Sequence, residues 1–379
     1  IEITNCIIQS NSAERYGAGI YCEQAAPLIQ SCLLVSNTTE VRDGGAICAT
    51  DGYFAGNDSQ LACDGPTIVE TKIVYNKARE GGGLYAEGAI YTLERCVIAG
   101  NSAIYNGGGL MSLSGGQFLA TNCLVSGNIA SRGSGFYNNN ARVVLQSCTV
   151  VDNGTAADDG AFYFNGVSQY QMVNTIIAGN RGIGVINCHD NPQSYVDRCL
   201  FHNNPDGDYY NVECMRCFTG AHEINLNVLE TDNNIEGDPL FDYSLAGNWT
   251  DPPFYDPVQD VTILTDTTAS FIPDELSSRL INPNTTQTLQ VLITSNTATT
   301  ITVVGDITQI SNQNTGYCVP DYHLSNGSAG LDRAITASSP SVDIDTDPRP
   351  GSDGLTDIGF DEADSSFQPP DDNSPPISY

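Results

Sequence analysis

Four carboxylates precede glycine-rich phrases and could perform acid–base chemistry: Asp43, Glu80, Asp158 and Asp159. Glycosidic bond cleavage needs two carboxylates in one groove, roughly 5 Å apart or roughly 6.5–9.5 Å apart depending on the mechanism. Three arginines flank the same turns: Arg15, Arg42 and Arg79. A column of opposite charges is typical of a structural ion network. We therefore expect these carboxylates to be structural, with a carbohydrate-active pair as the alternative.

Two acidic clusters offer the oxygen ligands that calcium prefers. In NNPDGDYYN, Asn204 is followed by Asp206 and Asp208 at alternate positions around a glycine turn. In DIDTD, the acidic residues are Asp343, Asp345 and Asp347. The sequence predicts calcium as a candidate cofactor at these five aspartates, and ordinary solvated turns are the alternative.

Eleven of the thirteen cysteines fall into three groups. Six of them recur in a small-residue column that also admits threonine: Cys6, Cys32, Thr71, Cys96, Cys123, Cys148, Thr175 and Cys199. Because threonine substitutes freely there, we expect inward, unpaired thiols rather than disulfides between coils. Cys48 and Cys63 bracket an inserted loop, roughly residues 50–66, and are candidates for a disulfide. The third group, which shares Cys199 with the column, gathers near His189 and His202, where disulfides are favoured over zinc: Cys188, Cys199, Cys214 and Cys217.

These residues are spaced by an internal repeat of about 25 residues. Phrases such as TNCIIQSN, ERCVIAGN and TNCLVSGN end in an asparagine column: Asn11, Asn37, Asn76, Asn101, Asn128, Asn153, Asn180 and Asn204. A second phrase, such as GGAIC or GGGLM, carries an apolar column: Ile20, Ile47, Leu84, Leu110, Phe136, Phe162 and Val185. Apolar runs of this length are too short for helices and are rich in β-branched residues. Three short strands per repeat predict an all-β fold, a right-handed parallel β-helix over residues 1–242.

The pattern changes after the solenoid. Residues 243–320 alternate Val, Ile, Leu and Thr between Asn and Asp-Pro turns, which predicts an inserted small antiparallel β module. Residues 321–364 form a separate closing segment, and residues 365–379 are a tail rich in Pro, Ser and Asp.

Charge and hydropathy limit the partners. The chain has 14 Lys and Arg against 45 Asp and Glu, a net charge of −31. This charge disfavours nucleic acid and anionic membranes. No apolar run is long enough to span a bilayer, so we expect no membrane span. No charged region followed by an apolar run opens the sequence, so we expect any signal peptide to have been removed or to lie outside this chain.

The closing segment resembles a known family. DPLFD, DYHL, DIDTDPRP and TDIGFDE are similar to the end of bacterial choice-of-anchor Q domain proteins. The GG-[AG]-[ILF] phrases resemble the polymorphic outer-membrane protein repeats of chlamydial type. The phrase SPSVDID departs from that family's pattern because the usual glycine after Asp is missing. These resemblances imply secretion and surface display, and they imply no catalytic residue set.

We therefore expect a non-catalytic, secreted structural protein of the extracellular space or the bacterial cell surface. Its partner would be a second copy, in a head-to-tail filament, or an extracellular polysaccharide or protein that it binds as an adhesin. The filament expectation comes from the first strand phrase, IEITNCII, which has no polar cap before it; the alternative is that earlier coils of a longer protein provide the cap. The rival expectation is a polysaccharide lyase, glycoside hydrolase or carbohydrate-binding protein on the same fold.

Overall fold

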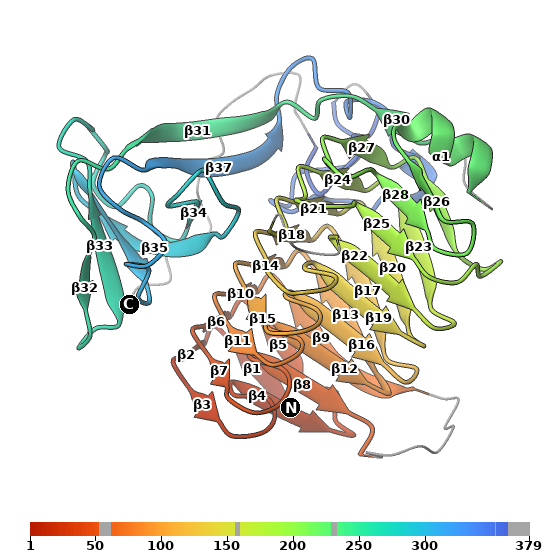
Figure 1. The fold of residues 1–379 in the computed structure, drawn as a ribbon, viewed down its shortest axis with the longest axis horizontal. Helices are drawn as coiled ribbons and strands as arrows, with labels where there is room; N and C mark the ends of the chain where they lie inside the picture. Colours follow the sequence, from red (N-terminus) through yellow and green to blue (C-terminus); the bar gives the residue numbers. More distant parts are fainter. Residues whose placement is uncertain (53–61, 156–159, 229–232, 353, 363–379) are drawn as a thin grey trace. The chain divides into compact units, whose positions relative to one another are not determined.

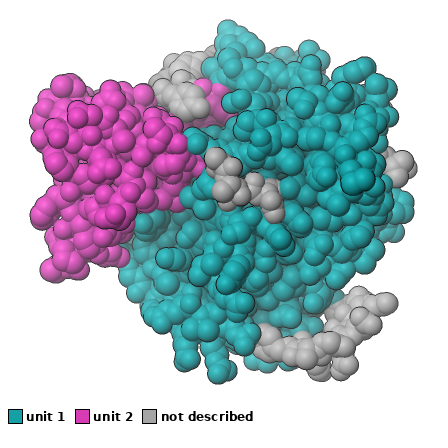
Figure 2. Space-filling view, viewed as in Figure 1, with its two compact units in different colours: residues 1–240, 324–365 teal, residues 241–323, 366–379 magenta. Residues whose placement is uncertain are grey.

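A computed structural model describes residues 1–52, 62–155, 160–228, 233–352 and 354–362. The chain divides into two compact units, which are coloured in Figure 2. Unit 1 comprises residues 1–240 and 324–365, and unit 2 comprises residues 241–323 and 366–379. The sequence-based division had placed the boundaries of the inserted module at residues 243 and 320.

Unit 1 is a parallel β-helix of about eight turns over residues 2–211 (Figure 1). Successive coils add one strand each to the same sheets, so equivalent residues stack in register. The fold class predicted from the repeat is therefore confirmed.

Four sheets run along the coils. Sheet A consists of β1 (Glu2–Thr4), β5 (Leu28–Gln30), β9 (Cys63–Val69), β13 (Ala89–Glu94), β17 (Gln117–Thr121), β20 (Arg142–Gln146), β23 (Gln169–Val173) and β26 (Tyr195–Asp197). Sheet B consists of β2 (Ile7–Gln9), β6 (Leu33–Val35), β10 (Lys72–Val74), β14 (Val97–Ala99), β18 (Leu124–Ser126), β21 (Thr149–Val151), β24 (Ile176–Ala178), β27 (Leu200–His202) and β30 (Ile235–Glu236). The short sheet C consists of β3 (Ser12–Ala13), β7 (Thr38–Thr39), β11 (Lys77–Ala78) and β15 (Ser102–Ala103). Sheet D consists of β4 (Ile20–Glu23), β8 (Ile47–Thr50), β12 (Leu84–Glu87), β16 (Leu110–Leu113), β19 (Phe136–Asn139), β22 (Phe162–Asn165), β25 (Val185–Asn187), β28 (Tyr209–Asn211) and the antiparallel β29 (Arg216–Phe218).

The inserted loop is shorter than the sequence suggested. We expected it over residues 50–66, but β8 ends at Thr50 and β9 already begins at Cys63. The first residues of β9 pair with β13 through a register shift between Ile90 and Thr92. A bulge of this kind absorbs the extra residues within the strand, so part of the expected loop is sheet.

A buried asparagine ladder joins the coils. The Nδ2 group of Asn76 donates to Oδ1 of Asn101 at 3.0 Å, and Asn101 donates to Asn128 at 3.0 Å. The backbone N–H of each asparagine donates to the same Oδ1 atom of the next coil, as from Asn101 to Asn128 at 2.9 Å. The ladder runs from Asn11 to Asn204, where Nδ2 of Asn204 donates to Asp208 at 2.7 Å. These bonds satisfy polar groups that are fully buried in the middle coils.

The cysteine column has a different role from the ladder. The thiols of Cys96 and Cys123 each approach the carbonyl oxygen two residues earlier, at 3.3 and 3.2 Å. Thr71 and Thr175 donate to the equivalent carbonyls at 2.9 and 3.0 Å. A hydroxyl and a thiol can therefore fill the same inward position, which explains why threonine and cysteine alternate in this column.

The closing segment of unit 1 is held against the solenoid at the corner between sheets A and B. Two corner residues with left-handed backbone, Asn122 and Asn174, supply the contacts. Asn122 donates to the carbonyl oxygen of Val342 at 2.6 Å, and Asn174 accepts from the N–H of Ile335 at 2.9 Å. This segment contains the 3-10 helix η1 (Thr336–Ser338). The short helix α1 (Ala221–Asn227) follows β29 in unit 1.

Unit 2 has two small antiparallel sheets. One consists of β32 (Phe254–Asp256), β33 (Val261–Thr265), β36 (Thr300–Val304), β35 (Val291–Asn296) and β34 (Leu280–Ile281). The other pairs β31 (Phe241–Asn248) with β37 (Gly316–Leu324). Trp249 is buried and stacks on Tyr317 with ring centroids 4.0 Å apart. The small antiparallel module expected here is confirmed. Among the described residues, no helix is long and apolar enough to cross a membrane.

Candidate functional site

The outer side of sheet D carries a column of large side chains. The strand register stacks Cys48 on Tyr85, Tyr85 on Met111, and Met111 on Tyr137. Although these side chains point away from the main core, they are almost completely buried in a second apolar cluster. The column is therefore mainly structural along the middle coils.

The glycine phrases explain how this column is covered. Gly44 has φ +74°, and a Cβ atom placed there would lie 2.7 Å from Cβ of Cys48. Gly107 has φ +64°, and a Cβ atom there would lie 2.7 Å from Cβ of Met111. Only glycine permits both the left-handed backbone and the close approach of the turn to the stacked side chains.

The turns that cover the column bring two candidate carboxylates together. The backbone of Asp43 bridges to Tyr16 on one side and to Glu80 on the other. The Asp43 residue is 8% exposed. Oε1 of Glu80 accepts a hydrogen bond from Nδ2 of Asn106 at 2.9 Å. The pair stacks on adjacent coils, which lie about 4.8 Å apart in a β-sheet. Asp158 and Asp159 lie outside the described residues.

Arginines surround this pair. The guanidinium carbon of Arg42 lies 5.9 Å from the ring centroid of Tyr16, and that of Arg79 lies 5.1 Å from the ring of Tyr105. Both arginines lower the pKa of Asp43. Arg15 is exposed at the equivalent turn of the first coil.

Burial nevertheless dominates the acidity of this cluster. Burial, followed by the negative charge of Glu80, raises the pKa of Asp43 to about 7. Burial also raises the pKa of Glu87 in β12, which accepts a hydrogen bond from Tyr85 at 3.4 Å. With a pKa of about 7, the Asp43 carboxyl group can hold a proton near neutrality, as a general acid must. Sequence analysis missed Glu87 because its column carries different residue types from coil to coil.

The first calcium candidate is built into a turn. Asp206 is exposed, but Asp208 is buried, and its two carboxylate oxygens accept from Asn204 and from the N–H of Gly220, each at 2.7 Å. Asp208 therefore ends the asparagine ladder, a role that sequence analysis did not assign to it. Calcium binding at Asp206 and Asp208 stays a prediction.

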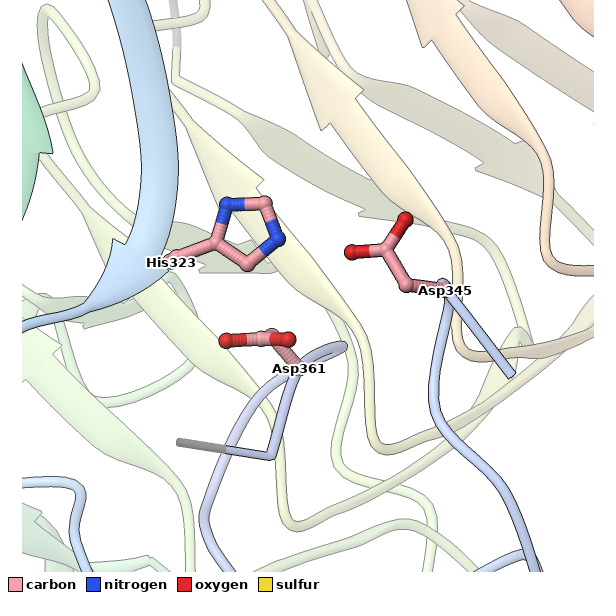
Figure 3. A group of neighbouring side chains, drawn as sticks. All are labelled: His323, Asp345 and Asp361. Carbon is pink, nitrogen blue, oxygen red and sulfur yellow. The ribbon is translucent and has the colours of Figure 1, made fainter. Parts of the chain in front are cut away.

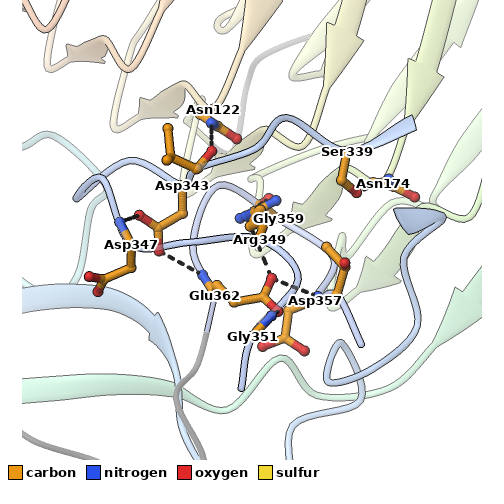
Figure 4. Close-up of polar contacts among 12 residues, drawn as sticks. Asn122, Asn174, Ser339, Asp343, Asp347, Arg349, Gly351, Asp357, Gly359 and Glu362 are labelled. Atoms are coloured by element: carbon orange, nitrogen blue, oxygen red, sulfur yellow. Dashed lines mark hydrogen bonds and ion pairs between the residues drawn. The ribbon is translucent and has the colours of Figure 1, made fainter. Parts of the chain in front are cut away.

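The second calcium candidate lies in the closing segment (Figure 4). Asp343 is fully buried, and its carboxylate accepts backbone hydrogen bonds from Asp345, Asp347 and Glu362 at 2.9, 2.8 and 3.1 Å. Asp345 and Asp347 are exposed. The Asp343 carboxylate thus shapes the turn, and calcium binding by the three aspartates stays a prediction.

A buried arginine lies beside this turn. Nη2 of Arg349 donates to the carbonyl oxygen of Gly359 at 3.0 Å, and Nε lies 3.6 Å from Glu362. Glu362 accepts backbone hydrogen bonds from Gly351 at 2.8 Å and Asp357 at 3.1 Å. Burial raises the pKa of Glu362 to about 7, despite these bonds and the arginine.

Figure 3 shows Asp345 together with two side chains not yet described, His323 and Asp361. His323 belongs to unit 2, where its Nδ1 atom contacts the carboxylate of Asp321. Asp321 also lies 3.1 Å from Nη2 of Arg279. Asp345 and Asp361 belong to unit 1, where Asp361 is buried.

None of the thirteen cysteines, all of which lie within the described residues, forms a disulfide. The expectation of unpaired inward thiols is therefore confirmed. The disulfides expected between Cys48 and Cys63 and among the last four cysteines are wrong. Cys48 is buried under the glycine turn in the column of sheet D, which keeps it from bridging the loop. Nδ1 of His189 lies 3.3 Å from the carboxylate of Glu213, and Nε2 of His202 lies 3.7 Å from that of Asp238. Each histidine therefore contacts an acidic side chain.

A polar groove on sheet A was missed by sequence analysis. It has a volume of about 540 Å³ and is lined by Arg142, Gln169, Gln171, Pro192, Gln193 and Tyr195. Four of them, Arg142, Gln169, Gln171 and Tyr195, come from the weakest of the three strand phrases, where outward positions follow no fixed type, and the other two lie in the turn before β26. A spacing of 27 residues between Arg142 and Gln169 is the one signal that could have placed them on neighbouring coils.

Comparison with known proteins agrees with the fold. No curated protein and no solved structure matches the chain. Residues 59–215 match the family model described as the right handed beta helix region, which gives the hand of the solenoid.

Proposed function

We propose that this chain is a non-catalytic structural or cell-surface protein of the extracellular space. The observation that carries the proposal is the continuous asparagine ladder, which joins every coil from Asn11 to Asn204 through side chains that are buried from Asn37 onward. Such a column resists separation of neighbouring coils because each break leaves buried amides unpaired. The net charge of −31 and the resemblance to choice-of-anchor Q proteins support a secreted, surface-exposed setting.

The protein would act either as a subunit of a head-to-tail filament or as an adhesin for polysaccharide or protein. Electron microscopy of native material, together with fractionation of the source cells, tests this role. Filaments or cell-surface retention support it. Protein confined to the cytoplasm contradicts it.

One observation favours a catalytic alternative, a lyase or hydrolase that acts on polysaccharide. Asp43, with its pKa raised to about 7, lies next to Glu80 on the adjacent coil. Against this alternative, Asp43 is almost fully buried and Glu80 is bound by Asn106.

Product analysis on a panel of neutral and acidic polysaccharides separates the two proposals. The non-catalytic proposal expects the same absence of products from the wild type and from Asp43→Asn. Cleavage that is lost in Asp43→Asn would overturn it.

A further inference from the structure

The groove on the outer side of sheet A is formed by three neighbouring strands and one loop. Arg142 of β20 stacks on Gln169 of β23, and Gln171 of β23 stacks on Tyr195 of β26. All four side chains are partly exposed because alternate residues of these strands point outward. The fourth side of the groove is the loop that carries Pro192 and Gln193.

The loop is held firmly in place. The N–H of Gln193 donates to Oδ1 of Asn191 at 2.9 Å, and the N–H of Ser194 donates to the carbonyl oxygen of Asn191 at 2.9 Å. The buried hydroxyl of Ser194 accepts from the N–H of Tyr170 at 3.1 Å. The wall of the groove is therefore preformed, which lowers the entropy cost of binding a ligand.

Polar side chains of the groove hold one another in place. Nη2 of Arg142 donates to Oε1 of Gln171 at 3.0 Å, and Nε2 of Gln169 donates to Oε1 of Gln193 at 2.7 Å. Each amide keeps further donor or acceptor capacity, and the guanidinium has five N–H groups in all. Within the described part of the chain, no carboxylate pairs with Arg142 and no hydrogen bond engages the hydroxyl of Tyr195.

We propose that this groove binds a neutral oligosaccharide through Arg142, Gln169, Gln171, Gln193 and Tyr195. The amides can donate and accept and the guanidinium can donate, in a fixed array that suits the vicinal hydroxyls of a pyranose. The Tyr195 ring offers an apolar face for the C–H side of a sugar and a polar hydroxyl at its end. The volume of about 540 Å³ lies in the ordinary range of ligand sites and suits a few sugar units.

Other ligand classes fit the groove less well. Its lining contains no Asp or Glu, so it lacks the carboxylate pair of a glycosidase, and it lacks ligands for a metal. Strands β20 and β23 are each paired on both sides, so neither offers an open edge to a peptide strand, and only the short β26 ends the sheet. A single arginine in a chain of net charge −31 disfavours acidic glycans and nucleic acid.

This inference gives the proposed surface protein a partner class, and it rests on that proposal. The test is isothermal titration calorimetry of the full chain against neutral gluco-, xylo-, manno- and galacto-tetrasaccharides, with tetragalacturonate as the acidic arm. We expect binding to at least one neutral probe, weakened about tenfold or more in Tyr195→Ala and in Gln171→Ala. The matched control is Gln146→Ala, because Gln146 also points outward from β20 but does not line the groove.

The outcomes are separable. Binding to a neutral probe that Gln171→Ala weakens and Gln146→Ala leaves unchanged supports the proposal. Absence of binding to every neutral probe, binding to tetragalacturonate alone, or equal binding by all variants overturns it. Far-UV circular dichroism checks each fold, and Arg142→Ala replaces Tyr195→Ala if the latter fails to fold. Product analysis of the same mixtures reports on catalysis, so cleavage would refute the non-catalytic role while the binding data still judge the groove.

Discussion

Replacing Asn101 by leucine tests the asparagine ladder directly. The carboxamide of Asn101 makes four hydrogen bonds and is fully buried. Its Oδ1 accepts from the N–H and Nδ2 of Asn76 at 2.9 and 3.0 Å, and its Nδ2 donates to the carbonyl of Ile73 at 2.8 Å and to Asn128 at 3.0 Å. Leucine has nearly the same shape but none of these groups.

The loss can be counted group by group. Asn128 keeps its bond from the backbone N–H of Asn101, and Nδ2 of Asn76 keeps its bonds to Leu34 and Val74. One buried backbone group, the N–H of Asn76, loses its partner, whereas the carbonyl of Ile73 also lies in the ladder between β10 and β14. Since an unsatisfied buried group costs about 1–3 kcal/mol, Asn101→Leu should lower the free energy of unfolding by about 1–3 kcal/mol.

Urea unfolding followed by far-UV circular dichroism measures this loss. The matched control is Asn11→Leu, because Asn11 is exposed and makes one side-chain bond, to Asn37 at 2.9 Å. We expect the control to change the free energy of unfolding by less than about 1 kcal/mol. Hydrogen exchange at the Asn76 amide should accelerate in Asn101→Leu. Unfolding of Asn101→Leu at the wild-type midpoint, with unchanged exchange at Asn76, would refute the ladder argument.

Three further predictions concern the interior, the buried acids and calcium. Cys96→Thr should unfold within about 1 kcal/mol of the wild type, because threonine makes the same bond at Thr71 and Thr175, whereas a loss of several kcal/mol by urea unfolding would contradict this. The folded-state pKa of Glu362 is raised to about 7, so its protonated form favours folding and this stability is lost as the pH rises from about 4.5 to about 7. Glu362→Gln should therefore show a smaller fall in melting temperature between about pH 5 and pH 8 than the wild type, and an equal fall would count against the reasoning. Calcium should raise the melting temperature through Asp206, Asp208, Asp343, Asp345 and Asp347, and a melting temperature unmoved by a chelator would exclude this.

The repeating positions of the fold could be predicted from the sequence. A coil repeats the same local geometry, so Asn101 and Asn128 must meet the same turn and the same neighbour above and below. The inward thiols followed from the exchange of Cys123 for Thr175 in one column, because only a small inward position admits both. The alternation in residues 243–320 likewise predicted an antiparallel module.

The non-repeating features were decided by tertiary structure. The groove joins Arg142, Gln171 and Gln193, which belong to no repeating column, and it exists because the loop of Gln193 bonds to β23 beside Arg142. Burial of Asp43 under its own turn determines its pKa, and sequence spacing alone shows only that Glu80 is near. The docking of residues 335–360 on Asn122 and Asn174 joins positions more than 150 apart along the chain. Contacts of that range depend on how whole elements pack, so no local pattern encodes them.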